Sequence, residues 1–175
     1  DAKNLELHKL LRRFIDVCDA VHYAHSRGVL HRDLKPGNIM LGKYGETLLV
    51  DWGLAKSIDG SDSPTVLDGP PLQFGSGSGS APTSMGSVVG TPGYMSPEQA
   101  AGRLDLLSPA SDVYGLGATL YHLLTGEAPF RDKLSDVLKK IERGEFRPPR
   151  QVNSRIPQAL EAVCLNAMAR SPEDR

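Results

Sequence analysis

His31-Arg32-Asp33-Leu34-Lys35-Pro36-Gly37-Asn38 is the stretch that decides the fold, together with Asp51-Trp52-Gly53 a short apolar run later. Proline and glycine interrupt the first segment too closely for a single helix, so we expect a loop. It carries an acid, a lysine and an amide at fixed offsets, and the second segment adds another acid. Carboxylate and amide oxygens suit a hard divalent cation, and a lysine can neutralise a phosphate group. The pattern predicts a catalytic loop.

The composition is that of a soluble globular domain. A net charge of -1 over 175 residues gives no general attraction to nucleic acid or anionic lipid, and we expect no nucleic-acid partner. No apolar run is long enough to cross a bilayer, and no signal peptide opens the chain. Cys18 and Cys164 lie in helical patterns without a partner at metal-ligand spacing. We therefore expect buried free thiols and a reducing, cytoplasmic location.

Hydrophobic periodicity predicts an α+β fold that is mainly helical. Amphipathic patterns predict helices over 5–25, 134–143 and 160–168, and a more uniformly apolar pattern predicts a central helix that starts at Ser108-Pro109. A short strand is expected at 29–30, and a small hairpin over 39–50 would bring Asp51 next to Asn38. Residues 147–150 read as a loop, and every element after the hairpin is expected to be helical.

Residues 57–87 are rich in Pro, Gly, Ser and Asp and include the repeat Gly75-Ser76-Gly77-Ser78-Gly79-Ser80. Such a segment cannot bury enough apolar surface to offset its ordering entropy, so we expect a flexible insert. On composition alone, an inert linker between two domains is equally acceptable. The stretch that follows, Gly90-Thr91-Pro92-Gly93-Tyr94-Met95-Ser96-Pro97-Glu98, favours a loop within one domain.

These motifs resemble those of eukaryotic-type (Hanks-type) serine/threonine protein kinases, most closely the bacterial group. The first segment fits the H-R-D-L-x-x-x-N signature at every defined position. Asp51-Trp52-Gly53 stands where that family usually has Asp-Phe-Gly, and Ser96-Pro97-Glu98 where it has Ala-Pro-Glu. The resemblance implies the C-terminal (large) lobe of a protein kinase-like fold. Residues 54–95 would then form a long activation segment that contains the insert.

The resemblance covers nearly the whole chain, but only the helical lobe of the family. The sequence has no G-x-G-x-x-G loop between strands and no V-A-I-K lysine. We therefore expect a partial kinase domain over 1–175 that is inactive alone and is completed by an N-lobe in the full-length protein. Members of the bacterial group often carry this domain on the cytoplasmic side of a membrane-anchored receptor kinase, although this chain contains no such anchor.

The resemblance implies transfer of the ATP γ-phosphate to serine and threonine hydroxyls of protein substrates, with ATP and Mg²⁺ as cofactors. Asp33 would be the catalytic base or hydroxyl-orienting group, and Lys35 would contact the phosphate. Asn38 and Asp51 would bind the metal, and the nucleotide would contact Lys35, Asn38, Met40 and Asp51. The alternative is a pseudokinase or docking module that binds partners without catalysis, because Trp52 and the missing lobe depart from the family pattern.

Further residues take regulatory or structural roles from the same resemblance. Arg32 would pair with a phosphate on the activation segment, for which the acceptors by position are Thr83, Ser84 and Ser87. Thr91 would contact Asp33 and Lys35 and help to form the substrate pocket, as in serine/threonine-specific members. Structural roles fall to His31, Trp52, Gly53, Glu98, Asp112 and Arg175; Asp112 would hold the catalytic-loop backbone, and Glu98 would form a buried ion pair with Arg175.

Overall fold

The computed structural model describes residues 2–57 and 90–175. The fold is α+β and mainly helical, as predicted. The expected insert 57–87 falls outside these ranges except for its first residue, as do Thr83, Ser84 and Ser87. The helices and strands are α1 (Ala2–Ser26), β1 (Val29–Leu30), β2 (Ile39–Leu41), β3 (Thr47–Leu49), β4 (Lys56–Ser57), α2 (Pro97–Ala100), α3 (Pro109–Thr125), α4 (Leu134–Arg143), α5 (Pro149–Val152) and α6 (Gln158–Ala167).

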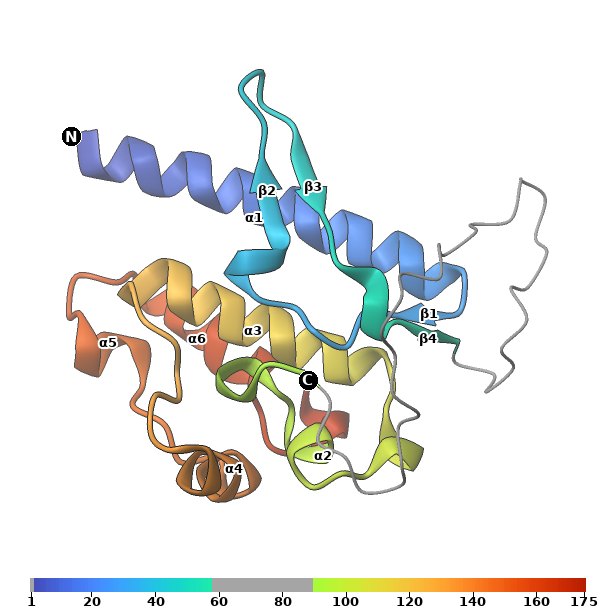
Figure 1. Ribbon diagram of the computed structural model, residues 1–175. Helices are drawn as coiled ribbons and strands as arrows, with labels where there is room; N and C mark the ends of the chain where they lie inside the picture. The colour runs from blue at the N-terminus through green and yellow to red at the C-terminus, as the bar shows by residue number, and fades with distance from the viewer. Residues whose placement is uncertain (1, 58–89) are drawn as a thin grey trace.

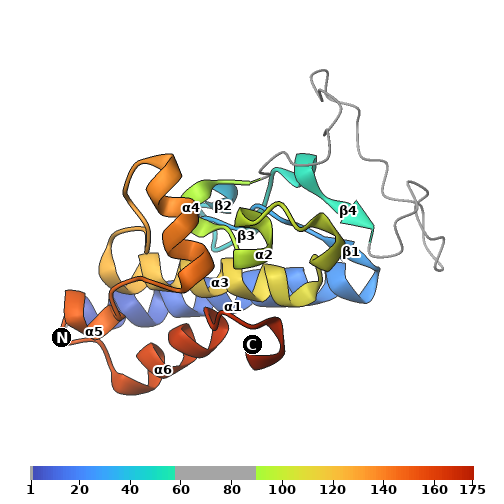
Figure 2. The ribbon, with the colours of Figure 1, turned by 90° about the horizontal axis from the view of Figure 1, so that it is seen from below.

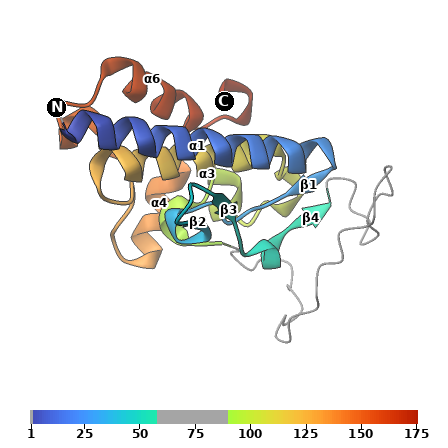
Figure 3. The ribbon, with the colours of Figure 1, turned by 90° about the horizontal axis from the view of Figure 1, so that it is seen from above.

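Two long helices, α1 and α3, form the centre of the fold and lie against each other (Figure 1). Seen from below and from above, α6 covers one side of this pair, while the strands and α2 lie on the other side (Figures 2 and 3). The layers therefore place the catalytic loop and the hairpin on one face of the helix pair.

The predicted central helix is confirmed. α3 starts after Ser108 with Pro109 in its first turn, where a missing N–H costs nothing. The backbone N–H of Ser108 donates to Oγ of Ser111 at 3.2 Å, and the helix ends at Gly126, whose φ of 81° needs a glycine. Its buried side chains join the main core, with others from α2, α4, α6 and the connecting loops: Met95, Ala100, Tyr114, Ala118, Leu120, Tyr121, Leu124, Phe130, Val137, Ile141, Ile156, Cys164 and Met168.

The predicted hairpin is also confirmed and has a fixed register. β2 pairs antiparallel with β3, with Ile39 opposite Leu49, and the Val50 N–H donates to the Asn38 carbonyl at 2.9 Å. A second apolar cluster of Val17, Val21 and Leu34 lies beneath it, and Ile39 and Leu49 pack against this cluster. The hairpin is thereby anchored on α1.

Three local expectations are wrong. Lys56 and Ser57 form β4, which pairs with β1, so an element after the hairpin is a strand and the insert does not begin at Ser57. β4 has only two residues and forms a strand because it pairs with Val29–Leu30, which lie far away in the sequence. No local sequence pattern indicates this pairing. Pro149–Val152 form α5 instead of a loop, since proline is accepted in the first turn of a helix.

The burial of two residues also differs from the expectation. Val163 is an apolar residue of the amphipathic pattern over 160–168, yet it is 57% exposed. Cys164 is buried as predicted, and burial raises the pKa of its thiol to about 12. Cys18 is only half-buried, although desolvation still raises its pKa to about 11. Within the described ranges, none of the helices has the length and apolar character needed to span a membrane.

The contact between α3 and α6 depends on the absence of a side chain at Gly117. A Cβ atom there would lie 2.8 Å from Cγ of Met168 and 2.9 Å from Cβ of Ala167. We expect Gly117→Ala to lower the free energy of unfolding by about 1–2 kcal/mol, because overpacking outweighs the gain in helix propensity. Thermal unfolding measures this change, with Ser135→Ala at an exposed position of α4 as the control. A Gly117→Ala protein as stable as the control would contradict the packing described here.

Candidate active site

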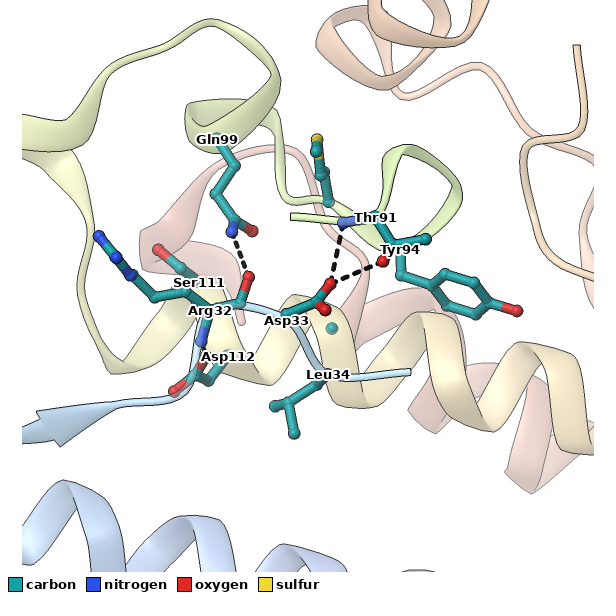
Figure 4. Close-up of a pocket in the computed structure, with 10 residues that line it drawn as sticks. Arg32, Asp33, Leu34, Thr91, Tyr94, Gln99, Ser111 and Asp112 are labelled. Carbon is teal, nitrogen blue, oxygen red and sulfur yellow. Dashed lines mark hydrogen bonds between the residues drawn. The ribbon is translucent and has the colours of Figure 1, made fainter. Parts of the chain in front are cut away.

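Asp33 lies at the centre of a bonded cluster between the catalytic loop and the segment that enters α2 (Figure 4). It is buried, and its Oδ1 accepts hydrogen bonds from the backbone N–H of Thr91 at 2.9 Å and from its hydroxyl at 2.8 Å. Nζ of Lys35 donates to Oδ2 of Asp33 at 2.6 Å and to Oγ1 of Thr91 at 2.6 Å. Thr91 is therefore in direct contact with Asp33 and Lys35, although it lies more than fifty residues further along the chain.

The charge state of Asp33 follows from these contacts. Burial raises the pKa of the carboxyl group, but the hydrogen bonds from Lys35 and Thr91 outweigh this effect, so the pKa lies below its ordinary value of 3.8. The carboxylate is thus ionised at neutral pH. It can accept a hydrogen bond from an incoming hydroxyl group and orient it.

Asn38 and Asp51 both lie at the base of the hairpin, where the Val50 N–H bonds to the Asn38 carbonyl. The Asn38 amide donates from Nδ2 to the carbonyl of Asp33 at 2.8 Å and to its Oδ2 at 3.2 Å, so its Oδ1 is directed elsewhere. Asp51 directly follows Val50, which is bonded to the Asn38 backbone. Its side chain is exposed, and among the described residues its carboxylate accepts no hydrogen bond.

This donor set fits magnesium. Mg²⁺ binds through one or two protein oxygens and completes its shell with water and phosphate oxygens. Across residues 2–57 and 90–175, no cluster of three or more His, Cys, Asp or Glu side chains could enclose a metal. Met40, expected at the nucleotide, lies outside the bonded cluster; it is 57% exposed on β2, opposite Leu48.

Asp112 holds the backbone of the catalytic loop from α3. Its Oδ2 accepts the N–H of His31 at 2.8 Å, and its Oδ1 accepts the N–H of Arg32 at 2.8 Å. These bonds support Arg32 at a φ of 68°, a conformation that a non-glycine residue rarely adopts. Nε2 of His25 also lies 2.8 Å from Oδ2 of Asp112, a contact from α1 that the sequence analysis missed.

Gln99 is a second residue that the sequence analysis missed. Its Nε2 donates to the Arg32 carbonyl at 2.6 Å (Figure 4). Its Oε1 accepts the backbone N–H of Ser96 at 3.0 Å. A signal existed, because Ser96-Pro97-Glu98-Gln99 has the S-x-x-Q spacing of a capping box. The helix cap therefore ties α2 to the catalytic loop.

The Arg32 side chain is half-buried and is directed at the start of the activation segment. Its Nε donates to the carbonyl of Leu54. The three hydroxyl residues proposed as its phosphorylated partners lie outside the described residues, so the pairing stays a prediction.

Glu98 and Arg175 form a buried bidentate ion pair. Nη1 of Arg175 lies 2.8 Å from Oε1 of Glu98, and Nη2 lies 3.0 Å from Oε2. The remaining guanidinium donors bind the carbonyls of Ala169, Ala110 and Arg170, and the hydroxyl of Ser111 donates to Oε1 of Glu98 at 2.7 Å. Burial raises the Glu98 pKa, but the bonds from Arg175 and Ser111 hold it below its ordinary value.

His31, Trp52 and Gly53 surround the segment that carries Asp51. The ring centroids of His31 and Trp52 are 4.6 Å apart. The left-handed backbone in this segment falls on Asp51, with a φ of 62°, and not on Gly53. Gly53 instead supplies space, because a Cβ atom there would lie 3.3 Å from Oδ1 of Asp51.

The hydrogen bonds of His31 define its protonation state. The N–H of Asp33 can only donate, so Nδ1 of His31, at 3.3 Å, is the acceptor; the Val50 carbonyl can only accept, so Nε2, at 3.2 Å, carries the proton. The ring is therefore neutral. Burial, the largest effect, lowers its pKa below 6.5 despite the nearby acids.

A pH-dependent contribution to stability follows. Because the folded-state pKa of His31 is lowered, its stabilisation is fully present above pH 6.5 and is lost as the pH falls through the folded value. We expect the stability difference between the wild type and His31→Phe to be larger at pH 7.5 than at pH 5.5, measured by thermal unfolding. A difference that stays constant across this range would contradict the neutral assignment.

Comparison with known proteins places these features in a family. The family model of the protein kinase domain matches residues 2–175. The chain is 48% identical over 141 residues to serine/threonine-protein kinase PknD of Protochlamydia amoebophila, covering 80% of this chain and 14% of that protein. It is 38% identical over 161 residues to serine/threonine-protein kinase PknB of Mycobacterium leprae, covering 91% and 23%.

A third relative, serine/threonine-protein kinase PknD of Chlamydia felis, is 37% identical over 177 residues, covering 99% of this chain and 18% of its own length. The chain thus spans less than a quarter of each of these curated relatives. The match extends over both described ranges and includes every residue of the bonded cluster around Asp33. The chain belongs to the protein kinase domain family and is similar to its bacterial, Hanks-type serine/threonine members.

Proposed function

We propose that the protein containing this chain transfers the γ-phosphoryl group of ATP to serine and threonine hydroxyls of other proteins. The observation that carries the proposal is the bonded cluster of Asp33, Lys35, Asn38 and Thr91. Asp51 follows Val50, whose N–H bonds to the Asn38 carbonyl. Phosphoryl transfer requires little covalent chemistry from the protein; it requires an oriented hydroxyl, cations at the phosphates and a held metal. The cluster offers a group for each of these tasks.

Asp33 takes the role of orienting the substrate hydroxyl and accepting its proton. Its ionised carboxylate accepts four hydrogen bonds here, two from Thr91 and one each from Lys35 and Asn38, so the substrate hydroxyl takes the place of one of these donors. Lys35 lies on the same carboxylate and can move a short distance to a phosphate oxygen, where it would offset negative charge. The Lys35 and Thr91 contact supports serine/threonine specificity.

Asn38 and Asp51 would hold the magnesium ion of the ATP complex. Bound Mg²⁺ would supply positive charge at the phosphate oxygens. The exposed pair Met40 and Leu48 offers an apolar surface next to these ligands that suits a nucleotide base. Since ATP is an intracellular substrate, we place this reaction in the cytoplasm, either in a free protein or on the cytoplasmic side of a membrane-anchored one.

Arg32 would regulate the site. Its backbone is bound by Asp112 and Gln99, and its side chain reaches the first residues of the activation segment. A phosphate on Thr83, Ser84 or Ser87 would pair with this cation and order the segment.

The chemical identity of the product tests the proposal. The full-length protein is incubated with γ-labelled ATP, Mg²⁺ and a generic basic protein, and the labelled amino acids are separated after acid hydrolysis. We expect phosphoserine and phosphothreonine without phosphotyrosine. Phosphotyrosine would refute the specificity. A folded protein with a phosphorylated activation segment that transfers no label would refute kinase activity and favour a docking module.

A further inference from the structure

Two aromatic rings bind the backbone immediately before Asp51. Nε1 of Trp52 donates to the carbonyl of Leu49 at 3.1 Å, and Nε2 of His31 donates to the carbonyl of Val50 at 3.2 Å. The two rings contact each other at an interplanar angle of 56°. Both carbonyl groups that precede the metal-ligand candidate are therefore held by ring N–H donors.

The strand pairing explains why the Leu49 carbonyl is available. In an antiparallel ladder, hydrogen-bonded residue pairs alternate with pairs that are not hydrogen-bonded. The Val50 N–H bonds to Asn38, and the Gly42 N–H bonds to Glu46, so the Ile39 and Leu49 pair falls between two bonded positions. The Leu49 carbonyl consequently points away from β2, and the indole supplies a donor that the hairpin cannot.

The residue between these anchors has an unfavourable backbone. Asp51 lies at φ 62° and ψ 62°, a left-handed conformation that an aspartate adopts less readily than a glycine. Among the described residues its carboxylate accepts no hydrogen bond that would fix this conformation locally. The conformation therefore depends on its neighbours, and Trp52 is the next residue in the chain.

We propose that Trp52 is a positioning residue: its indole N–H, bound to the Leu49 carbonyl, holds Asp51 in the left-handed conformation beside Asn38 before metal and nucleotide bind. This inference rests on the proposed function for the role of Asp51. The hydrogen bond from the Trp52 indole to the Leu49 carbonyl, which we call the latch, is a property of the protein alone. The phenylalanine that kinases usually have at this position could keep the contact with His31, but it has no N–H to donate. The tryptophan is thus more than a larger core side chain.

The test removes the donor and keeps the ring. In the full-length protein, Trp52 is replaced by phenylalanine and, separately, by 3-benzothienylalanine, which keeps both rings and substitutes sulfur for the N–H. Thr125→Val is the control, because it removes a hydroxyl that bonds to the carbonyls of Tyr121 and Glu127 and to the Glu127 N–H at the far end of α3. Thermal unfolding of all variants measures any general loss of stability.

Two readouts apply. Amide hydrogen exchange over residues 51–54 is measured without nucleotide, and the dissociation constant of magnesium-ADP is measured by calorimetry. Loss of one hydrogen bond predicts exchange about fivefold faster and binding about fivefold weaker for both Trp52 variants, with no change for Thr125→Val. Wild-type exchange in the benzothienyl variant would overturn the latch.

Two other outcomes are also decisive. An equal increase in exchange throughout the chain, with lower thermal stability, would overturn the positioning role in favour of a purely structural one. Faster local exchange in a protein that binds no magnesium-ADP in any variant would support the latch while refuting the proposed function. The exchange measurement therefore separates the two claims.

Discussion

Asp33→Asn in the full-length protein is expected to lower kcat by a factor of about 10² to 10⁴, the range for a group that accepts or orients a proton in the transition state. The KM for ATP should change little, because the residue contacts the substrate hydroxyl and not the nucleotide. In the variant, the side-chain NH₂ group of the new asparagine would also face hydrogen-bond donors. In the wild type, Oδ2 of Asp33 accepts hydrogen bonds from Lys35 and Asn38, and Oδ1 accepts one from the Thr91 hydroxyl.

Initial rates over a range of ATP concentrations give kcat and KM separately. Asp136→Asn, at an exposed position in the first turn of α4, makes the same chemical change away from the site and should leave both constants unchanged. Thermal unfolding checks that the Asp33→Asn protein is folded. A folded variant that keeps the wild-type kcat would remove Asp33 from the reaction.

Arg175→Ala is expected to lower the free energy of unfolding by about 3–5 kcal/mol, because it leaves the Glu98 carboxylate buried without its cation. The side chains of Arg175 and Glu98 are 0% and 4% exposed, so water cannot replace the lost partner. Three backbone carbonyls also lose their donor. Chemical denaturation measures the change; Arg103→Ala, which breaks the exposed pair with Asp105, should have little measurable effect.

The pH dependence of this effect has a definite sign. The Glu98 pKa is lowered in the folded protein, so its contribution is fully present above its ordinary pKa of 4.5 and is lost as the pH falls through the folded value. The difference between wild type and Arg175→Ala should therefore be constant near pH 7 and shrink below pH 4.5. A variant as stable as Arg103→Ala at pH 7 would show that the buried pair does not stabilise the fold.

Local sequence patterns predicted the elements that carry their own cap or turn signals or a strong hydrophobic period. The helix that starts at Ser108-Pro109 carries its own cap signal, and the hairpin over 39–50 has apolar strands around a glycine turn. The β1 and β4 pair was not predictable, because two residues carry no period and exist as a strand only through a partner far along the chain. α5 was missed because Pro148 and Pro149 mark a loop as often as a first helical turn.

The site shows the same division. Motif spacing identified Asp33, Lys35, Asn38 and Thr91, which the structure brings into contact. The contact between His25 and Asp112 was not predictable, since 87 residues separate them and no local pattern links them. The left-handed backbone of Arg32 and Asp51 was also unpredictable, because neither residue is a glycine, and the backbone of Arg32 is bound by Asp112, which lies far along the chain.

The central claim is that the β2–β3 hairpin brings Asp51 close to Asn38, and that these two residues bind the magnesium ion of a protein kinase. The most direct test is phosphate transfer from γ-labelled ATP to a generic basic protein by the full-length protein and its Asp51→Asn variant, over a range of Mg²⁺ concentrations. We predict robust transfer by the wild type and none detectable by the folded variant at physiological Mg²⁺. Equal transfer by both proteins would contradict the assignment of Asp51 as a metal ligand.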